Sequence, residues 1–266
     1  MSGSTISANA LFHFTNDLIE IEDSLINGFY PRYCLEDFSY LFSKEKTKEN
    51  YKYAVPMICF CDIPLSQIKK HIAYYGRYAI GLSKEWGRKN KINPVMYILE
   101  ESLPTTYLRE IFELFYDNDS SFFDCDYKNQ KGDKLNTIAA YFNQFTTYLK
   151  PYENFRDNKT AEVKYYDERE WRYVPDINEL IRLGLPLKLG EYKFVKEVDA
   201  FNKILYKNCR LSFNYEDLKY IIVSREKEVY DMVERIDKID NSIFSCVAKR
   251  LLYTKIISLE KILQDF

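Results

Sequence analysis

Two short segments of the chain carry residue types that could recognise the ribose of a nucleotide. The first is Phe12-His13-Phe14-Thr15, an aromatic and β-branched run that is typical of a strand. In a strand His13 and Thr15 point to the same face, so an imidazole and a hydroxyl would lie side by side and could bond the two ribose hydroxyls. A half-buried histidine that is satisfied by a backbone carbonyl is the alternative interpretation.

The second segment, residues 165–173 (YYDEREWRY), alternates as a strand that would place Glu168, Glu170 and Arg172 on one face. Carboxylates two residues apart in a strand lie about 7 Å apart. One of them could hold a ribose hydroxyl while the other orients an incoming nucleophile. Like charges at this distance raise the pKa of one carboxyl group, and Arg172 opposes that effect. A lattice of salt bridges on a solvent-facing strand is the alternative.

Between these segments lies a tyrosine-rich stretch that includes Tyr75 and Tyr78, either of which could stack on a planar ligand. Packing in the core is the alternative, because the chain has 24 tyrosines. His71, near the end of a helical pattern, is expected to be structural. With only two histidines in the chain, a histidine-rich metal centre is excluded.

The cysteines indicate reduced thiols rather than disulfides or a metal site. Their spacing is irregular, and Cys59 and Cys61 form a C-x-C pair without a second pair nearby. A zinc site needs four close ligands, so we expect no metal. These features favour a cytoplasmic protein with buried free cysteines.

The elements that must position these residues follow from hydrophobic periodicity and breakers. Strands are expected at 11–15, 54–61, 77–82, 94–99, 163–174 and 219–224. Helices are expected from Leu18 to Gly28 with Asn16 as the cap, from Leu65 towards Gly76, at 135–149 before Pro151, and at 229–239. The lysine-rich residues 43–53 are expected to form a surface loop. We therefore predict a flexible N-terminus over 1–10 and one α+β domain over 11–266.

Composition supports a folded chain without a strong charge preference. The 266 residues are 46% hydrophobic and 17% aromatic, which argues against disorder, and the net charge of −2 gives no global attraction to nucleic acid or anionic membranes. The longest apolar stretches have six or seven residues, against roughly 20 for a membrane helix. No membrane partner is expected.

Several long strings resemble the AbiGi family of abortive phage-infection proteins. They are PMICFCDIPLSQIKKHIAYYGRYAIGLSKEW, NPVMYI, LKPY and YYDEREWRYVP, and the likeness extends from about residue 11 to residue 174. The resemblance implies a part in phage defence. Because the family is described as the antitoxin of a phage-defence pair, it also implies a cognate toxin or antitoxin protein as the partner and allows a non-enzymatic binding module.

The order of the motifs also resembles ADP-ribosyltransferase-like domains, and toxins of the DarT type share the H-x-T opening. This likeness implies a split, mostly antiparallel β-sheet cleft flanked by helices, with NAD⁺ as the substrate. It assigns His13, with Thr15 beside it, to the adenine-side ribose, and Tyr75 or Tyr78 to the nicotinamide.

The same likeness makes Glu170 the catalytic carboxylate, which would stabilise an oxocarbenium-like transition state, while Glu168 orients the acceptor. The acceptor would be a nucleic acid or a protein. Many such toxins carry a basic substrate-binding loop, but no such segment is obvious here, because a solvated loop explains the basic Lys44–Lys52 as well. Two functions therefore follow from the sequence: an ADP-ribosyltransferase-like effector and a non-enzymatic antitoxin. A nuclease-like protein is less favoured because Glu168 and Glu170 lack a third acidic metal ligand.

Overall fold

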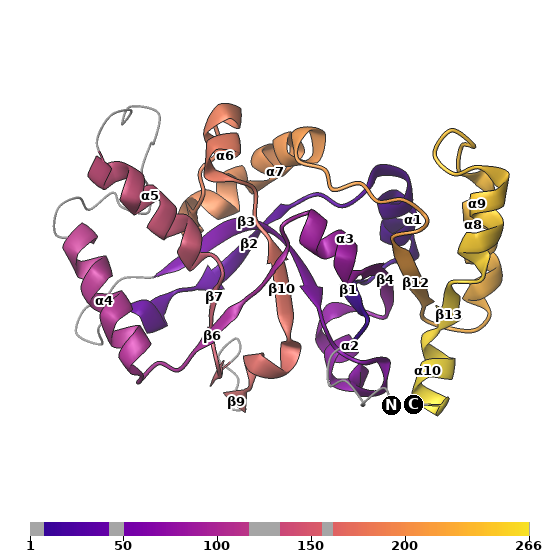
Figure 1. Cartoon of the computed structure of the whole chain (residues 1–266), viewed down its shortest axis with the longest axis horizontal. Coiled ribbons are helices and arrows are strands. Elements are labelled where there is room, and N and C mark those ends of the chain that lie inside the picture. Colours follow the sequence, from indigo (N-terminus) through magenta and orange to yellow (C-terminus); the bar gives the residue numbers. More distant parts are fainter. Residues whose placement is uncertain (1–7, 43–50, 117–133, 156–161, 266) are drawn as a thin grey trace.

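The computed structural model describes residues 8–42, 51–116, 134–155 and 162–265. It is a mixed α+β structure built around a mostly antiparallel sheet (Figure 1). Residues 1–7, most of the expected flexible N-terminus, and 43–50, most of the expected lysine-rich loop, lie outside the described residues. Ala10, by contrast, is buried and begins the first strand.

The main sheet has nine strands, seven of which follow one path in the order β13-β12-β4-β1-β3-β10-β5. Every pair in this sheet is antiparallel except β12 with β13. The bounds of the seven strands are β13 Ile256–Ser258, β12 Leu218–Val223, β4 Tyr78–Ser83, β1 Ala10–Thr15, β3 Lys52–Cys61, β10 Glu170–Tyr173 and β5 Asn93–Pro94. The other two, β2 Arg32–Asp37 and β11 Leu189–Gly190, both pair with β3. These findings confirm the predicted α+β class and antiparallel sheet.

The sheet splits between β1 and β3. The two strands share one register pair, Phe12 opposite Cys61, whereas β1 pairs with β4 along its whole length. The N-terminal half of β3 turns instead to β2, from Asp37 opposite Lys52 to Arg32 opposite Met57. Strand β3 therefore serves two sets of neighbours, β1 and β10 at its C-terminal end and β2 along its N-terminal half.

Alternating side chains along the central strands bury both faces of the sheet. On β1, Leu11 packs in one core with α1, α3, α8 and α9, while Ala10 and Phe12 pack in another with α10. Strand β12 repeats this pattern, with Ile221 on the first face and Ile222 on the second. A period of two with apolar residues on both faces is what a central, doubly covered strand requires.

The helices cover these cores, with α4 and α5 at one end of the molecule and α8 and α9 at the other (Figure 1). Their bounds are α1 Leu18–Asn27, α2 Lys69–Tyr75, α3 Lys84–Lys89, α4 Leu103–Tyr116, α5 Lys134–Thr146, α6 Ile177–Leu183, α7 Glu191–Asn208, α8 Glu228–Lys238, α9 Cys246–Tyr253 and α10 Leu259–Asp265. A third core lies between β2, the N-terminal half of β3 and helices α4 to α7.

Helix α1 forms as its sequence dictates, with one correction. Gly28 ends it with φ at 71°, where a Cβ would meet the Leu211 carbonyl oxygen at 2.5 Å. The N-cap is Asp17 rather than the expected Asn16, and its carboxylate accepts the Ile19 N–H at 2.7 Å. An acidic cap also suits the positive end of the helix dipole.

The predicted strand over 163–174 is wrong in its middle. It divides into β9 (Glu162–Val163), a 3₁₀ turn η5 (Tyr165–Glu168) and β10. Arg169 causes the break because it adopts a left-handed conformation with φ at 45° and ψ at 48°. Glu168 and Glu170 therefore do not share a strand.

Two other predicted elements also end differently. The helix expected at 135–149 stops at Thr146, and Leu149–Pro151 forms strand β7, parallel to β6 (Met96–Ile98). The strand expected at 94–99 is divided between β5 and β6, which belong to different sheets. The remaining pair, β8 (Asn154–Phe155) with β9, is a separate two-stranded sheet.

Candidate functional site

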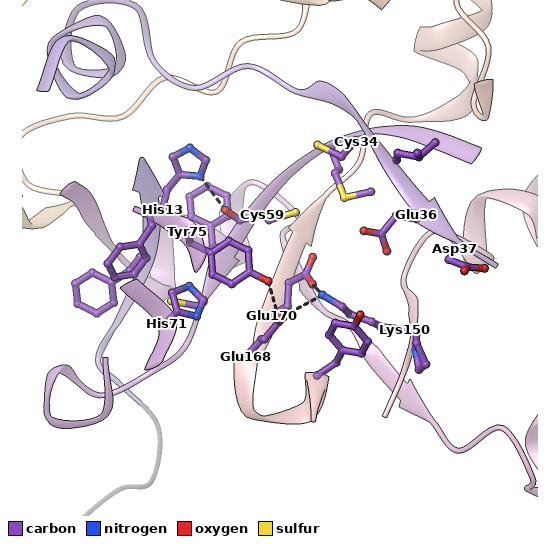
Figure 2. Close-up of a pocket in the computed structure, with 18 of the residues that line it drawn as sticks. His13, Cys34, Glu36, Asp37, Cys59, His71, Tyr75, Lys150, Glu168 and Glu170 are labelled. Carbon is purple, nitrogen blue, oxygen red and sulfur yellow. Dashed lines mark hydrogen bonds and ion pairs between the residues drawn. The ribbon is translucent and has the colours of Figure 1, made fainter. Parts of the chain in front are cut away.

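A cavity of about 700 Å³ lies where the sheet splits, a size that suits a drug-sized ligand. Its walls come from β1, β2, β3, α2, β7, η5 and β10. Figure 2 shows His13, His71 and Tyr75 on one side and Glu36, Asp37 and Lys150 on the other, with Glu168 and Glu170 between them. Segments distant in sequence thus meet at one site.

His13 lies in the split between the two strands. Its Nδ1 is 2.8 Å from the Cys59 carbonyl oxygen, so the imidazole bridges β1 to β3 where the backbone ladder is missing. Its ring packs edge-on against Phe29 and lies 5.7 Å from the Phe60 ring. Burial lowers the pKa of His13 below its ordinary value, although the contact with Cys59 opposes this shift. His13 is therefore a neutral hydrogen-bonding group near neutral pH.

Glu170 begins β10 and is held by a buried arginine. Arg172 Nε donates to Glu170 Oε1 at 2.5 Å, and its two Nη groups donate to the Thr147 carbonyl and to Glu36 Oε2, both at 2.8 Å. Glu170 is 6% exposed and Arg172 is 0% exposed. Burial alone would raise the pKa of Glu170, but Arg172 and Lys150 outweigh it, and the carboxyl pKa lies below its ordinary value. Glu170 is therefore ionised and already paired.

Lys150 on β7 joins the two glutamates. Its ammonium donates to Glu168 Oε2 at 2.5 Å and to Glu170 Oε2 at 2.6 Å, and it lies 4.9 Å from the centre of the Tyr165 ring (Figure 2). Burial would lower the pKa of Lys150, but Glu170, Glu36 and Glu168 together raise it well above its ordinary value. A shared ammonium thus brings the carboxylates together across the left-handed break at Arg169.

Helix α2 closes the cavity through Tyr75. The Tyr75 hydroxyl donates to Glu168 Oε1 at 2.5 Å, and its ring stacks on His71 with centroids 4.3 Å apart. His71 in turn contacts Phe14 of β1 edge-on. His71, which we expected to be only structural, therefore lines the cavity as well.

The structure brings together four of the six predicted site residues: His13, Tyr75, Glu168 and Glu170 line one cavity. Thr15 and Tyr78 are not among the lining residues. The Thr15 hydroxyl donates to Glu20 Oε2 at 2.5 Å and is 3.1 Å from the backbone of Asp17, so it organises the start of α1. Tyr78 follows the Gly76 turn and bonds Glu228 of α8.

Comparison with known proteins places the chain in a family. A family model described as "Putative abortive phage resistance protein AbiGi, antitoxin" matches residues 27–224. The abortive phage resistance protein AbiGi of Lactococcus lactis subsp. cremoris is 30% identical over 259 residues, covering 90% of this chain and 100% of that protein. The chain belongs to the AbiGi family of abortive phage resistance proteins. No solved structure matches it, so the ADP-ribosyltransferase-like fold remains a prediction.

The region that matches the AbiGi model contains most of the cavity wall. Glu36, Tyr75, Lys150, Glu168 and Glu170 all fall within residues 27–224. Strand β1, with His13, precedes the matched region, although β1 lies at the centre of the sheet. The cavity is therefore largely built from the segment that the AbiGi model describes.

Sequence reasoning missed Lys150 and Glu36, two charged residues that line this cavity. We did not predict Lys150 as a site residue because it follows the helix expected at 135–149, whereas it is the middle residue of strand β7. Glu36 follows an alternating pattern in β2 (RYCLED), which could have predicted a strand with one polar face. Neither pattern could have shown that both side chains meet Glu170 and Arg172.

The cavity thiols are poorly suited to nucleophilic chemistry. Cys34, Cys59 and Cys61 line the cavity as free cysteines. Burial raises the pKa of Cys34 to about 11 and raises that of Cys59 well above its ordinary value. Both thiols are thus protonated at neutral pH, and the thiolate is the reactive form. Within the described residues no cluster of histidine, cysteine and acidic side chains could hold a metal ion, and no helix is long and apolar enough to cross a membrane.

The lining fits part of NAD⁺ better than the whole. His13, Tyr75, Glu168 and Glu170 are suited to an aromatic ring and ribose hydroxyls. The pyrophosphate would need cations or a helix N-terminus, but the two lysines that line the described part of the cavity are Lys52, which is exposed, and Lys150, which is paired. The described residues therefore do not form a phosphate site inside the cavity.

Proposed function

We propose that this chain is the antitoxin of an abortive-infection pair and that it acts by binding a toxin rather than by catalysis. Its membership of the AbiGi family, whose model carries the word antitoxin, supports the role. The structural observation that carries the proposal is the neutralised Glu170: Lys150 and Arg172 bond both of its oxygens inside the protein. A carboxylate held between two cations offers little net negative charge to a developing positive charge in a transition state.

The test is a co-expression experiment in bacteria. The chain would be expressed with the product of the neighbouring gene, and growth and co-purification would be measured. We expect the wild-type chain to restore growth and to co-purify with that product, and we expect Glu168→Gln to protect as well as wild type. Growth that stays inhibited in the presence of the soluble chain would overturn the proposal.

ADP-ribosyl transfer from NAD⁺ to a nucleic acid or protein is the second candidate. It is favoured by one observation: His13 from β1 and Glu170 from β10 line the same cavity, which an NAD⁺ site would require. The purified chain would be incubated with NAD⁺, and released nicotinamide would be measured. This candidate requires release by wild type, loss of release in Glu170→Gln, and retention in Glu226→Gln, which changes an exposed glutamate paired with Lys261.

A further inference from the structure

We propose that the cavity binds an aromatic, hydroxyl-rich ligand that is neutral or positively charged, the class of nucleosides and cationic base ribosides, and that it discriminates against the corresponding phosphorylated nucleotides. This goes beyond the antitoxin role and requires no catalysis. It follows from the distribution of charge and aromatic surface around the cavity.

The charged end of the cavity carries an excess of carboxylates. Four acidic side chains line the described wall, namely Glu36, Asp37, Glu168 and Glu170. They face Lys52, Lys150 and the buried Arg172 behind Glu170, which leaves the group with one more negative than positive charge. A phosphate monoester would bring about −1.5 to −2 more charge into this group. Such a charge would be repelled in a partly buried site, where screening by salt is weak.

Two of the three cations of this group, Lys150 and Arg172, are already engaged with carboxylates. Lys150 donates to Glu168 and Glu170, and Arg172 donates to Glu170, Glu36 and the Thr147 carbonyl. A phosphate could recruit either cation only by breaking contacts to a buried carboxylate. Hydroxyl groups need no such exchange, because each carboxylate oxygen can accept more than one hydrogen bond.

The opposite end of the cavity offers aromatic surface. The His71 ring contacts both Phe14 and Tyr75, and Phe60 lies beside the ring of His13. His13 is neutral because burial lowers its pKa, so it contributes a hydrogen bond but no attraction for an anion. An aromatic base fits this end, and ribose hydroxyl groups fit the carboxylate end.

The experiment uses two matched pairs of probes with the full chain. Calorimetry would compare nicotinamide riboside, a cation, with nicotinamide mononucleotide, and adenosine with AMP. We expect each riboside to bind at least about tenfold more tightly than its phosphorylated partner. A difference of this size is close to the contribution of one hydrogen bond to a charged group. Equal or tighter binding of the mononucleotides would overturn the proposal, and so would failure of both ribosides to bind.

A variant shows whether the carboxylates set this preference. Glu36→Gln removes one charge from a side chain that is 24% exposed, and the amide oxygen of glutamine can still accept the hydrogen bond from Arg172. We expect its ratio of nicotinamide mononucleotide Kd to riboside Kd to fall towards one, whereas Glu226→Gln, far from the cavity, keeps the wild-type ratio. Glu168→Gln repeats the test on a carboxylate that Arg172 does not contact. An unchanged ratio of the two Kd values in both cavity variants would contradict the proposal. Neutralisation of the toxin, measured with the same protein preparations, tests the antitoxin role separately.

Discussion

The Tyr75 hydroxyl donates to Glu168 Oε1 at 2.5 Å, although the two residues are 93 positions apart in the chain. This bond ties helix α2 to the 3₁₀ turn before β10 and closes the cavity between them. Lys150 holds the other oxygen of the same carboxylate. Glu168 is thus fixed from two sides, and it reaches Glu170 through a shared ammonium rather than through a common strand.

Replacing Tyr75 by phenylalanine should therefore loosen α2 while leaving the ring stacked on His71. We expect a loss of about 0.5–1.5 kcal/mol in the free energy of unfolding, the typical contribution of one hydrogen bond. Urea denaturation would measure it. Tyr166→Phe is a suitable control because Tyr166 is 49% exposed, and it should change stability little. An equal effect in both variants would mean that the Tyr75–Glu168 bond contributes nothing specific.

The sequence predicted the elements that depend on local patterns and missed those that depend on distant contacts. Strand β1 and helix α1 follow from aromatic alternation, helical spacing and the glycine at 28. The break at Arg169 could not be predicted, because a left-handed arginine has no local requirement and depends on the surrounding structure. Its carbonyl accepts the Asp62 N–H at 3.0 Å, a contact between segments more than 100 residues apart.

The site was predicted to a similar degree and for similar reasons. His13, Glu168 and Glu170, which the H-x-T and E-x-E motifs singled out, line one cavity, and their roles stay predictions. The sequence did not show that Glu170 would be neutralised, because Lys150 reaches it from a short parallel strand of a different sheet. Charge balance inside a cavity depends on which distant side chains converge there, and local periodicity does not carry that information.

Glu170→Gln should destabilise the protein strongly at neutral pH. The substitution leaves Lys150 and Arg172 buried with one carboxylate fewer, and breaking a buried ion pair costs about 3–5 kcal/mol. Urea unfolding near pH 7 would measure the loss. Glu226→Gln, which removes an exposed carboxylate, should leave the unfolding free energy close to that of wild type.

The same carboxylate makes wild-type stability sensitive to acid. The pKa of Glu170 is lower in the folded chain than the ordinary glutamate value of about 4.3, so only the unfolded chain gains the proton as pH first falls through that value. Stability is therefore full above about pH 5 and decreases below it. Unfolding curves at several pH values should show a shallower decrease for Glu170→Gln, and parallel curves would contradict the assigned pKa shift.

Lys188→Met should stabilise the protein. Lys188 is 1% exposed, its ammonium lies 4.3 Å from the centre of the Phe38 ring, and burial lowers its pKa well below the ordinary value. It donates to the Thr146 hydroxyl, but that hydroxyl itself donates to the Asn143 carbonyl and keeps this bond in the variant. Burial penalises the charged form of this amino group, so an apolar side chain of similar volume should increase the free energy of unfolding.

The pH dependence of Lys188 checks the cause of this gain. The pKa of Lys188 is lower in the folded chain than its unfolded value of about 10.4, so at pH values between the two the unfolded chain binds more protons than the folded chain. The free energy of unfolding of the wild type therefore increases as the pH increases towards about 10.4. The advantage of Lys188→Met over wild type should shrink as pH increases from about 7 to about 10. Lys203→Met, on the exposed side of α7, should show neither the gain nor the pH dependence. A gain that is constant with pH would assign the effect to packing alone.

Gly76→Ala should be the most damaging small substitution near the cavity. Gly76 has φ at 110°, and a Cβ there would lie 2.1 Å from the Thr15 carbonyl oxygen, which is backbone and cannot move aside. Strained backbone of this kind costs about 1–3 kcal/mol, and the clash adds to it. Gly190→Ala is the matched control, since its added Cβ meets nothing within 4 Å and its φ is −57°. We expect a loss of more than about 2 kcal/mol in the first variant and little change in the second, measured by urea denaturation.

The turn at Gly76 and the Tyr75–Glu168 bond should depend on each other. Because Gly76 directly follows α2, Gly76→Ala should also displace Tyr75 from Glu168. The loss of unfolding free energy in the double variant should therefore be smaller than the sum of the losses for Gly76→Ala and Tyr75→Phe. Full additivity of the two substitutions would show that the turn at Gly76 and the Tyr75–Glu168 bond act independently.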